Sequence, residues 1–442
     1  MGRPDRRDAL PERPTASSGT RGLPRQFWAL SGGAFVFLIG YNMCYPFQTI
    51  YLNEQLGLSA TSIGLLIGIS LLLGLPFQIA GGVAVDRFGR RPVLALAVFA
   101  AVCLLLGLGL SRQLAVVIAV VAFEAVCGWA LFVTSTNAMI ADLTSWERRS
   151  EAFSILRVAM NAGITLGPLV AAPLIARDPS FRLAFVSGAA ICAVFLVIIL
   201  TRLGETRPPS AQAGSFVHAF RAYRVIVRDR HLLLFCLVSL LPLYVFAQVF
   251  VTMPIMLGDL QQVSAAQWGL LMVGYGLFVT VMQYPVVWLL RKRNDIVSLA
   301  VASACLGLGV GATPFTPWPL TFACIAVVSL GLVLFIPISA TVVSRLAPLE
   351  LRGRYMGAWT LVYMGGYALG PLLGGRAVDA LGGRTAFVLA GAIGLAGGAV
   401  FLLLRRRLRP PERPAESVDV FVTVASGRDP EPGPGEAAGP AS

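Results

Sequence analysis

Residues 82–91 read Gly82-Val83-Ala84-Val85-Asp86-Arg87-Phe88-Gly89-Arg90-Arg91. This polar stretch separates two apolar runs, at approximately 61–84 and 93–111. Each run has about the 20 residues that a helix needs to cross a hydrocarbon core of about 30 Å. The stretch therefore predicts a short turn between two membrane-spanning helices.

The same alternation of apolar runs and short polar breaks fills most of the 442 residues. We predict twelve spans, at approximately 27–51, 61–84, 93–111, 114–141, 151–176, 183–203, 232–257, 265–290, 296–314, 318–344, 354–377 and 385–404. Lipid offers no partner for backbone N–H and C=O groups, so each span should be helical. Charged residues make up 13% of the chain, against about 25% in soluble domains. The composition predicts an all-α membrane protein and excludes an ordinary soluble enzyme.

The net charge of +13 could suggest a nucleic-acid partner, but the basic residues are distributed by loop. With the amino terminus inside, 29 of the 35 Lys and Arg fall on one side of the twelve spans. This bias follows the positive-inside rule. We therefore predict a plasma (cytoplasmic) membrane protein with both termini in the cytoplasm and no bound nucleic acid.

The chain also repeats itself, because residues 147–168 align with 350–371 without a gap. We predict a six-helix bundle at 27–203, a cytoplasmic connector at 204–231 and a second six-helix bundle at 232–404, flanked by disordered cytoplasmic tails at 1–26 and 405–442. Aromatic residues and arginines alternate at helical spacing in 216–228, which predicts an amphipathic helix on the inner leaflet; a loose solvated linker is the alternative. Two parallel repeats are typical of transporters with a binding site near the midplane.

The stretch 82–91 matches, position for position, the G-x-x-x-D-R-x-G-R-R loop signature of the major facilitator superfamily. The chain resembles this family over roughly 27–405, which implies the major facilitator fold, with twelve transmembrane helices in two parallel six-helix repeats. The resemblance also implies a gating latch, formed by Gly82, Asp86, Arg87, Gly89, Arg90, Arg91 and Asp142.

The latch has a physical basis in the position of Asp86, which ends helix two and can face the positive amino end of a neighbouring helix. The resemblance implies that this neighbour is helix eleven, which begins near Gly353, and that Arg90 pairs with Asp142. These contacts would hold the cytoplasmic side shut when the cavity faces outward. The corresponding loop of the second half, 291–295, lacks the glycine and has moved the acid, so we expect a one-sided latch.

Helices five and eleven resemble the antiporter motif of the drug:proton branch, G-x8-G-x3-G-P-x2-G-G. Helix five carries it with substitutions, and the complete pattern stands in helix eleven. The alternative is structural, since both helices need small residues where the halves meet and a proline kink as a bending point. The hinge candidates are Asn161, Gly163, Gly167, Pro168, Gly357, Gly366, Gly370, Pro371, Gly374 and Gly375.

Glu124 is the acid that lies deepest in a predicted span. Drug-efflux members of the family carry an arginine four residues before a glycine in helix four, and here Glu124 stands four residues before Gly128. A carboxylate at that depth costs a few kcal/mol, and desolvation favours its neutral acid. Three interpretations stay open: Glu124 carries the coupling proton, forms a fixed ion pair with Arg157 at similar depth, or binds a cationic substrate.

The resemblance implies a cavity lined by helices one, four, seven and ten. Polar candidates on helices one and seven are Tyr41, Asn42, Tyr45, Gln48, Tyr244, Gln248 and Thr252, and an ordinary interhelical hydrogen bond is the alternative for each. An apolar, aromatic wall suits amphipathic compounds. We predict a secondary active transporter that exports small amphipathic or drug-like molecules by alternating access, in exchange for protons. A metabolite or sugar permease, or a non-transporting membrane receptor or assembly factor, are the alternatives.

No P-loop, nucleophile elbow or metal-ligand cluster occurs in the sequence, so we predict neither an enzyme nor an ATP-driven pump. We also expect no cofactor and no metal. The predicted partners are a small-molecule substrate, protons and the lipid bilayer, and we expect the protein to be a monomer.

Overall fold

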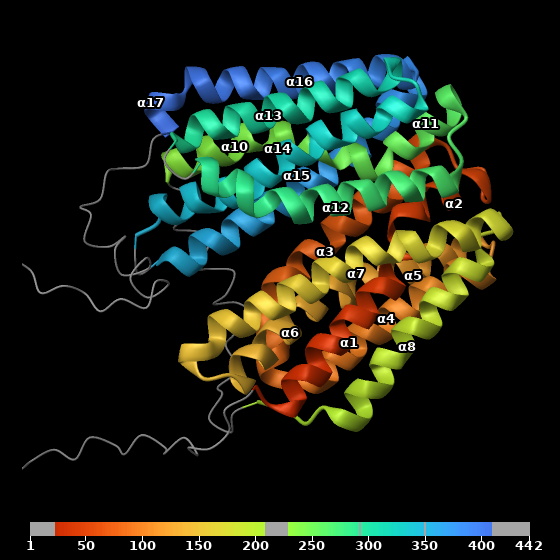
Figure 1. Ribbon diagram of the computed structural model, residues 1–442, viewed down its shortest axis with the longest axis vertical. Coiled ribbons are helices and arrows are strands. Elements are labelled where there is room, and N and C mark those ends of the chain that lie inside the picture. The colour runs from red at the N-terminus through yellow and green to blue at the C-terminus, as the bar shows by residue number, and fades with distance from the viewer. Residues whose placement is uncertain (1–22, 208–228, 291–292, 349–350, 409–442) are drawn as a thin grey trace, which may run out of the picture.

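A computed structural model describes residues 23–207, 229–290, 293–348 and 351–408. These residues form long helices joined by short loops, with no strand among them. Figure 1 shows two bundles of helices lying side by side, one built from the first half of the chain and one from the second. The amphipathic helix predicted within 216–228 lies outside the described residues.

The first bundle contains six spans, some of which are interrupted. Its helices are α1 (Arg25–Asn42), the 3-10 turn η1 (Tyr45–Phe47), α2 (Gln48–Glu54), α3 (Ala60–Phe88), α4 (Arg90–Leu110), α5 (Leu114–Cys127), α6 (Trp129–Leu143), the 3-10 turn η2 (Trp146–Arg148), α7 (Arg149–Arg177) and α8 (Arg182–Arg202).

The second bundle repeats this pattern. Its helices are α10 (Arg230–Val251), α11 (Met253–Gln261), α12 (Ala265–Leu290), α13 (Asp295–Ala312), the 3-10 turn η4 (Thr313–Phe315), α14 (Trp318–Leu346), α15 (Arg352–Leu381), α16 (Gly383–Leu403) and α17 (Arg405–Leu408). Residues 405–408, predicted to belong to a disordered tail, therefore form a short helix. Eleven of the spans are long and apolar enough to cross a membrane. The twelfth is α15, whose 30 residues are rich in glycine and tyrosine.

Three predicted spans are not continuous helices. The first is interrupted before Pro46, the fourth at Gly128 and the seventh at Thr252, two residues before Pro254. Proline lacks a backbone N–H and clashes with the preceding turn, which accounts for the first and third interruptions. The apolar pattern could not reveal these breaks because the sequence stays apolar across them.

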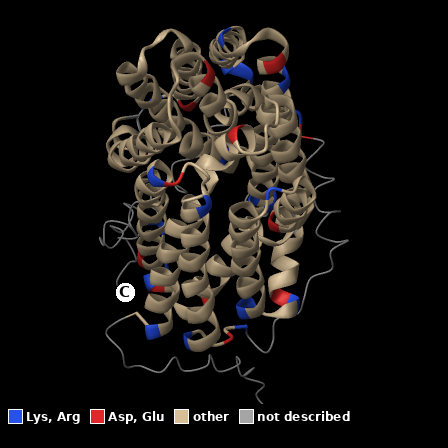
Figure 2. Ribbon diagram, turned by 90° about the vertical axis from the view of Figure 1, so that its right-hand side faces the viewer, with Lys and Arg blue, Asp and Glu red and all other residues tan. Residues whose placement is uncertain are grey.

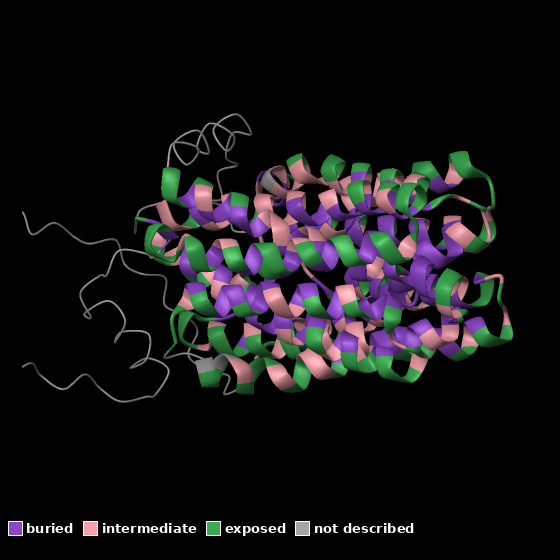
Figure 3. Cartoon of the chain, turned by 90° about the horizontal axis from the view of Figure 1, so that it is seen from above, coloured by how far each residue is buried: buried purple, intermediate pink, exposed green. Residues whose placement is uncertain are grey.

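Buried residues concentrate between the helices and exposed ones follow the outer faces, as Figure 3 shows. Within the first bundle α1 packs against α7 and α8, and within the second α10 packs against α15 and α16. The two halves meet where α3 runs beside α15 and α7 runs beside α12. Large apolar side chains on the outer faces, such as Ile69 and Leu200, are exposed, as a lipid-facing surface requires.

Most of the hinge glycines pack inside one half and not between the halves. Gly163 and Gly167 lie against α1, whereas Gly366 and Gly370 lie against α10. Gly375 is different, because it faces the carbonyl oxygen of Ala60 in the other half. The expectation that these small residues mark the interface of the halves is therefore wrong for most of them; they allow close packing of neighbouring helices within a bundle.

The two ends of the molecule differ in how the halves meet. We name them the Asp86 end, which also carries Asp142 and Asp295, and the Asp379 end, which carries the last turn of α15. Figure 2 views the molecule from the Asp379 end and shows how sparse the charged residues are.

At the Asp379 end the halves are in contact. The indole N–H of Trp268 donates to the carbonyl oxygen of Pro46 at 2.8 Å, and the Thr49 hydroxyl donates to the carbonyl oxygen of Phe250 at 3.4 Å. Gly64 lies directly against the backbone of Pro371. These contacts close the interface between the bundles at this end.

At the Asp86 end the bundles diverge (Figure 1). A Cβ added to Gly82 or Gly353 would meet nothing within 4 Å. The Asp86 side chain is 44% exposed. The expected neighbours, the end of α3 and the start of α15, are therefore apart in this structure.

Replacing Gly64 with valine is expected to separate α3 from α15 at the Asp379 end. The valine side chain would clash with the carbonyl oxygen of Pro371. Overpacking of this kind costs about 1–3 kcal/mol, which favours the open arrangement by roughly fivefold to a hundredfold. Spin labels at Gln113→Cys and Pro317→Cys, in a background without native cysteines, would report the distance across this end. Gly32→Val is the control, since a Cβ at Gly32 meets nothing within 4 Å. An unchanged distance distribution in Gly64→Val would contradict the prediction.

Candidate substrate cavity and gating residues

A cavity of about 370 Å³ lies between the halves, near the interruptions of spans one and four. Its volume is in the range of sites for small molecules. The lining residues come from α1, η1, α2, α3, α4, α5, α6, α7, α10, α12 and α15. Helix ten of the family scheme, here α14, contributes none of the described lining residues, so that part of the expectation is wrong.

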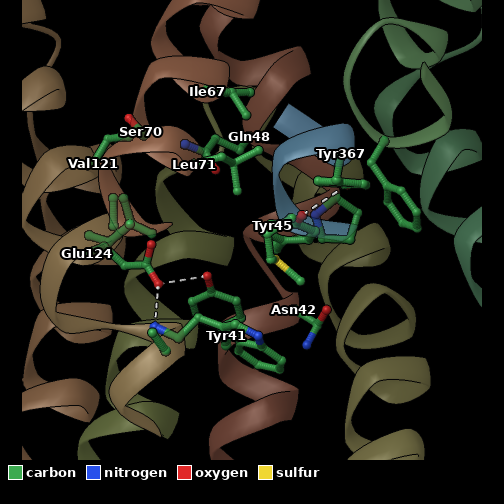
Figure 4. A pocket seen from close by; sticks show the side chains of 18 of the residues that line it. Tyr41, Asn42, Tyr45, Gln48, Ile67, Ser70, Leu71, Val121, Glu124 and Tyr367 are labelled. Carbon is green, nitrogen blue, oxygen red and sulfur yellow. Dashed lines mark hydrogen bonds between the residues drawn. The ribbon is translucent and has the colours of Figure 1, made fainter. Parts of the chain in front are cut away.

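The four candidates on helix one line this cavity, as Figure 4 shows. They are Tyr41, Asn42, Tyr45 and Gln48. The Asn42 amide nitrogen also donates to the carbonyl oxygen of Leu38 at 2.9 Å. Its side chain is 6% exposed, so much of it serves packing.

The three candidates on helix seven do not line the cavity. Gln248 donates to the carbonyl oxygen of Gly370 at 3.1 Å, and Thr252 donates to the Gln248 side-chain oxygen at 2.6 Å. Tyr244 lies on the same face of α10, beside Gly370. The cavity instead receives Phe246 and Phe250, which stand about 200° around the helix from this face. Gln248 therefore holds α10 to α15 within the second half.

Aromatic side chains from both halves line the cavity, and none of the five from the second half was predicted from the sequence. The aromatic lining residues are Tyr41, Tyr45, Trp129, Phe246, Phe250, Tyr275, Tyr363 and Tyr367. Two pairs, in α10 and in α15, stand four residues apart, which is the spacing of one helix face. That spacing is the sequence signal that could have identified them.

Tyr45 joins the two halves across the cavity. Its hydroxyl lies 3.2 Å from the hydroxyl of Tyr367 on α15, and its ring centroid lies 6.3 Å from that of Phe250 on α10. On its own side it stacks with Tyr41 at 6.0 Å. The tyrosines therefore form a continuous polar and aromatic surface from one half to the other.

Glu124 is the one carboxylate among the described lining residues, and no Lys, Arg or His is among them. Its Oε1 accepts a hydrogen bond from the Tyr41 hydroxyl at 3.0 Å and one from the backbone N–H of Trp129 at 3.3 Å. Figure 4 shows both contacts converging on the same oxygen. The second oxygen is left for another partner in the cavity.

The interruption of the fourth span lies next to Glu124 and places the start of α6 beside its carboxylate. Gly128 has φ −89° and ψ −107°, which ends α5 and lets α6 begin at Trp129. The first N–H groups of a helix lack helical partners and favour a negative charge, so the start of α6 is matched to the Glu124 carboxylate. A Cβ at Gly128 would clash with the Glu124 side chain. Interrupted helices that aim an end at a midplane site are a known device of transporters.

The ion pair between Glu124 and Arg157 does not form in this structure. Glu124 is bound to Tyr41 and Trp129, while the Arg157 side chain is exposed. Arg157 stands seven residues before Ile164, which lines the cavity, and seven residues return to nearly the same helix face. Arg157 therefore lies on the cavity side of α7, two turns nearer the Asp86 end. Counting residues from the membrane edge places Glu124 and Arg157 at similar depths, but it does not show that their side chains are apart.

At the Asp86 end the signature loop forms a cluster of charges. The Arg90 guanidinium forms an ion pair with Asp142 at the end of α6. Its Nη2 lies 3.8 Å from a carboxylate oxygen of Asp86. Arg90 is 7% exposed, so its charge is held between two acids. The contact fastens the α3–α4 corner to the end of the fourth span.

Glu205, just beyond α8, also binds this corner and was not expected from the sequence. Its carboxylate accepts the backbone N–H of Arg90 at 2.9 Å and that of Arg91 at 3.2 Å. Gly89 precedes them with φ +98° and leaves room for the Glu205 carboxylate. This glycine of the signature has no side chain to cap α4, so Glu205 supplies the cap from another part of the chain.

Burial alone would raise the pKa of Glu205, but bonds from the backbone N–H groups of Arg90, Arg207, Arg91 and Thr206 lower the pKa below its ordinary value. A lowered pKa in the folded state means that the stabilising contribution is complete above the unfolded pKa, about 4.3, and is lost as the pH falls through the folded pKa.

Glu205→Gln is therefore expected to lower the stability at pH 7 by about 1 kcal/mol, as loss of a helix cap does. The difference from the parent protein should disappear at a pH below the folded pKa, where the parent glutamate is itself neutral. Thermal unfolding in detergent at the two pH values would measure this, with exposed Glu147→Gln as the control. An equal deficit at both pH values would rule out the charged cap.

The second half repeats the ion pair with the charges exchanged. Asp295, the first residue of α13, lies 2.6 Å from Arg345 near the end of α14. Arg90 is likewise the first residue of α4, and Asp142 is near the end of α6. The expectation of a one-sided arrangement is therefore wrong for this pair. The loop of the second half lacks the signature glycine, so the sequence no longer shows the motif. The ion pair is still present, with the acid on the first residue of α13 and the arginine on α14.

Comparison with known proteins identifies the family. A family model described as Major Facilitator Superfamily matches residues 30–319 and 243–430, which together cover most of the chain. The chain is 26% identical over 403 residues to the Na(+), Li(+), K(+)/H(+) antiporter of Planococcus maritimus, covering 84% of this chain and 93% of the relative. It is 26% identical over 400 residues to the multidrug resistance protein MdtH of Salmonella paratyphi B, covering 88% and 94%.

The fold agrees with this assignment. A crystal structure of a POT family transporter in complex with 5-aminolevulinic acid superimposes with a TM-score of 0.74 at 15% identity, covering 88% of this chain and 98% of that chain. At this identity the likeness concerns the fold alone. The twelve spans, the central cavity and the matched family model agree, and the chain belongs to the Major Facilitator Superfamily.

Proposed function

We propose that this transporter exports amphipathic, drug-like molecules in exchange for protons, and that Glu124 carries the proton. The observation that supports this most directly is the solitary carboxylate in an aromatic cavity, with no basic residue among the described lining residues. A proton and a positively charged group of a substrate would compete for this carboxylate. Such competition is what an exchange mechanism requires.

The mechanism follows from the contacts of Glu124. In its charged form the carboxylate accepts bonds from Tyr41 and from the start of α6, which joins α1 to both parts of span four. A protonated acid interacts less well with a helix amino terminus, so proton binding weakens this junction. Tyr45, in η1 directly after α1, contacts Tyr367, so a change at Glu124 that moves α1 can reach the second half.

The wall of the cavity favours amphipathic substrates over sugars. Phenol and indole rings offer broad apolar faces with few hydrogen-bonding groups. The names of the two relatives, a cation/proton antiporter and a multidrug resistance protein, support the same class. A metabolite or sugar permease is the second candidate, favoured by the polar group formed by Asn42, Gln48 and Gln78 on the wall.

The Asp86 end is the cytoplasmic end in this proposal. The positive-inside rule assigns the arginine-rich loops to the cytoplasm. The protein would then lie in the plasma membrane with both chain ends on the cytoplasmic side. The structure, closed at the Asp379 end and open at the Asp86 end, would be the inward-facing state. Arg157 would stand in the open cytoplasmic entrance.

Purified protein in liposomes of neutral and anionic lipid, with a pH-sensitive dye inside, would test the proposal. We expect addition of lipophilic aromatic amines to release an imposed proton gradient in a protein-dependent manner, with empty liposomes as the control. Sugar-driven proton movement would favour the permease. A complete lack of uptake and proton movement across both compound classes would favour the non-transporting receptor or assembly factor.

A further inference from the structure

The end of α15 repeats the signature at the end of α3. Residues 81–91 read GGVAVDRFGRR and residues 374–384 read GGRAVDALGGR, so seven of eleven positions are identical. The repeat is unrelated to the symmetry of the two halves, because α15 corresponds to α7 and not to α3. Both copies end a helix at a glycine with positive φ, Gly89 at +98° and Gly382 at +79°. The two corners therefore share sequence and backbone conformation, at opposite ends of the molecule.

The acid of the second copy contacts the other half. Asp379 Oδ1 accepts the backbone N–H of Ala60 at 3.2 Å, and its Oδ2 accepts that of Thr61 at 2.8 Å. These are the first two residues of α3, whose N–H groups have no acceptor within their own helix. A carboxylate at this position is also favoured by the helix dipole. Asp379 thus caps a helix of the opposite bundle.

Close approach of the two helices makes this cap possible. Gly375, the second glycine of the repeated stretch, lies directly against the carbonyl oxygen of Ala60, and Gly64 lies against that of Pro371. A side chain at either glycine would push α3 away from α15. The glycine and the acid of the stretch therefore act together, one allowing contact and the other binding the exposed helix end.

We propose that Asp379 is the latch of the Asp379 end and that it works in opposition to Asp86. Helices α3 and α15 are antiparallel, and each carries the same acid at its carboxyl end, so that each acid stands at the same end of the molecule as the amino end of the other helix. In this structure the Asp379 latch is closed, while Asp86 is 44% exposed and the start of α15 at Gly353 is unobstructed. The α3–α15 pair thus carries two latches. The Asp379 latch is closed when the cavity opens at the Asp86 end, and the Asp86 latch is closed when the cavity opens at the Asp379 end. The inference rests on the proposed alternating access.

Spin-label distances test the two latches without any substrate. The Asp379 end is measured between Gln113→Cys and Pro317→Cys, and the Asp86 end between Ser150→Cys and Arg293→Cys, in the background without native cysteines. Hydrogen bonds to a charged group are worth about 1.5–3 kcal/mol, or about tenfold to a hundredfold in a population ratio. Asp379→Asn should raise the population open at the Asp379 end by about tenfold.

The variants give opposite results if the latches oppose one another. Asp86→Asn should lower the population open at the Asp379 end, and the double variant should return the ratio close to that of the parent. Glu54→Gln, which removes an exposed acid at the same end as Asp379, is the matched control. If Asp379→Asn does not insert into the membrane, Gly375→Ala, which keeps the acid but blocks the approach, should produce the same opening.

Two results would overturn the inference. One is a distance distribution in Asp379→Asn that matches the parent or the Glu54→Gln control. The other is a double variant that adds the effects of the single variants in one direction. Both are distinguishable from failure of the proposed function, because populations are measured without substrate or proton gradient. A protein that exchanges no compound for protons could still show opposed latches, and a working exchanger could lack them.

Discussion

Glu124→Gln is expected to abolish proton-driven accumulation of substrate while leaving binding of an uncharged substrate measurable. Glutamine keeps the shape of the side chain and can still accept from Tyr41 and from the N–H of Trp129, whose contacts hold Glu124. It cannot exchange a proton. A gradient of one pH unit is worth about 1.4 kcal/mol and can sustain about a tenfold concentration ratio for one-to-one exchange. In Glu124→Gln liposomes the ratio should fall to that of simple equilibration.

Glu147→Gln, which removes an exposed acid at the Asp86 end, is the matched control and should keep the full ratio. Undiminished proton-driven accumulation by Glu124→Gln would exclude Glu124 as the carrier of the coupling proton. Retained accumulation of neutral compounds with selective loss of cationic ones would instead support direct binding of substrate cations. The assay thus separates two of the interpretations of this residue.

Asp86→Asn is expected to fold and insert normally but to lose most transport. In this structure, which is open at the Asp86 end, Asp86 is 44% exposed, with its carboxylate 3.8 Å from Arg90 as the nearest ion-pair contact, so little folding energy depends on its charge. In the outward-facing state it would face the amino end of α15, where a full negative charge is favoured. Loss of that charged contact should lower the outward-facing population by about tenfold or more.

Transport rates in liposomes, normalised to the amount of inserted protein, would measure this effect. Thermal unfolding should differ little from the parent, which separates a conformational defect from a folding defect. Normal transport by a well-expressed Asp86→Asn protein would contradict the latch hypothesis. Loss of transport with a large loss of thermal stability would assign Asp86 a structural role instead.

Much of the fold could be predicted because membrane spans are local properties of the sequence. Twenty apolar residues are long enough to cross the bilayer wherever they occur. The arginines in the loops predict which side of the membrane each loop faces, and that sidedness stays a prediction. The signature at 82–91 identified the family for the same reason, since its residues are adjacent in the chain. The weak point was α15, where glycine and tyrosine reduce the apolar character, and there the internal repeat supported the prediction.

The candidate site was only partly predictable. Tyr41 and Glu124 are polar residues within apolar spans, which marks them as candidates, and the structure brings them together. Gln248 has the same sequence property, but its side chain points away from the cavity and binds Gly370. A span that is apolar on all faces carries almost no periodic signal for its rotation. The polarity of a residue within a span therefore identifies it as a candidate but does not predict which side chain or backbone group it contacts.

The sequence by itself determined the spans, the duplicated halves and the signature corner, because apolar length, repetition and short motifs are read along the chain. The tertiary structure alone decided that span four breaks at Gly128 beneath Glu124, that Arg157 lies apart from that acid, and that Asp379 caps α3. Each of these depends on how a helix is rotated and on which helix of the other half approaches it. In a membrane such contacts arise from packing of small residues and from backbone groups, which leave little trace in the pattern of hydrophobicity.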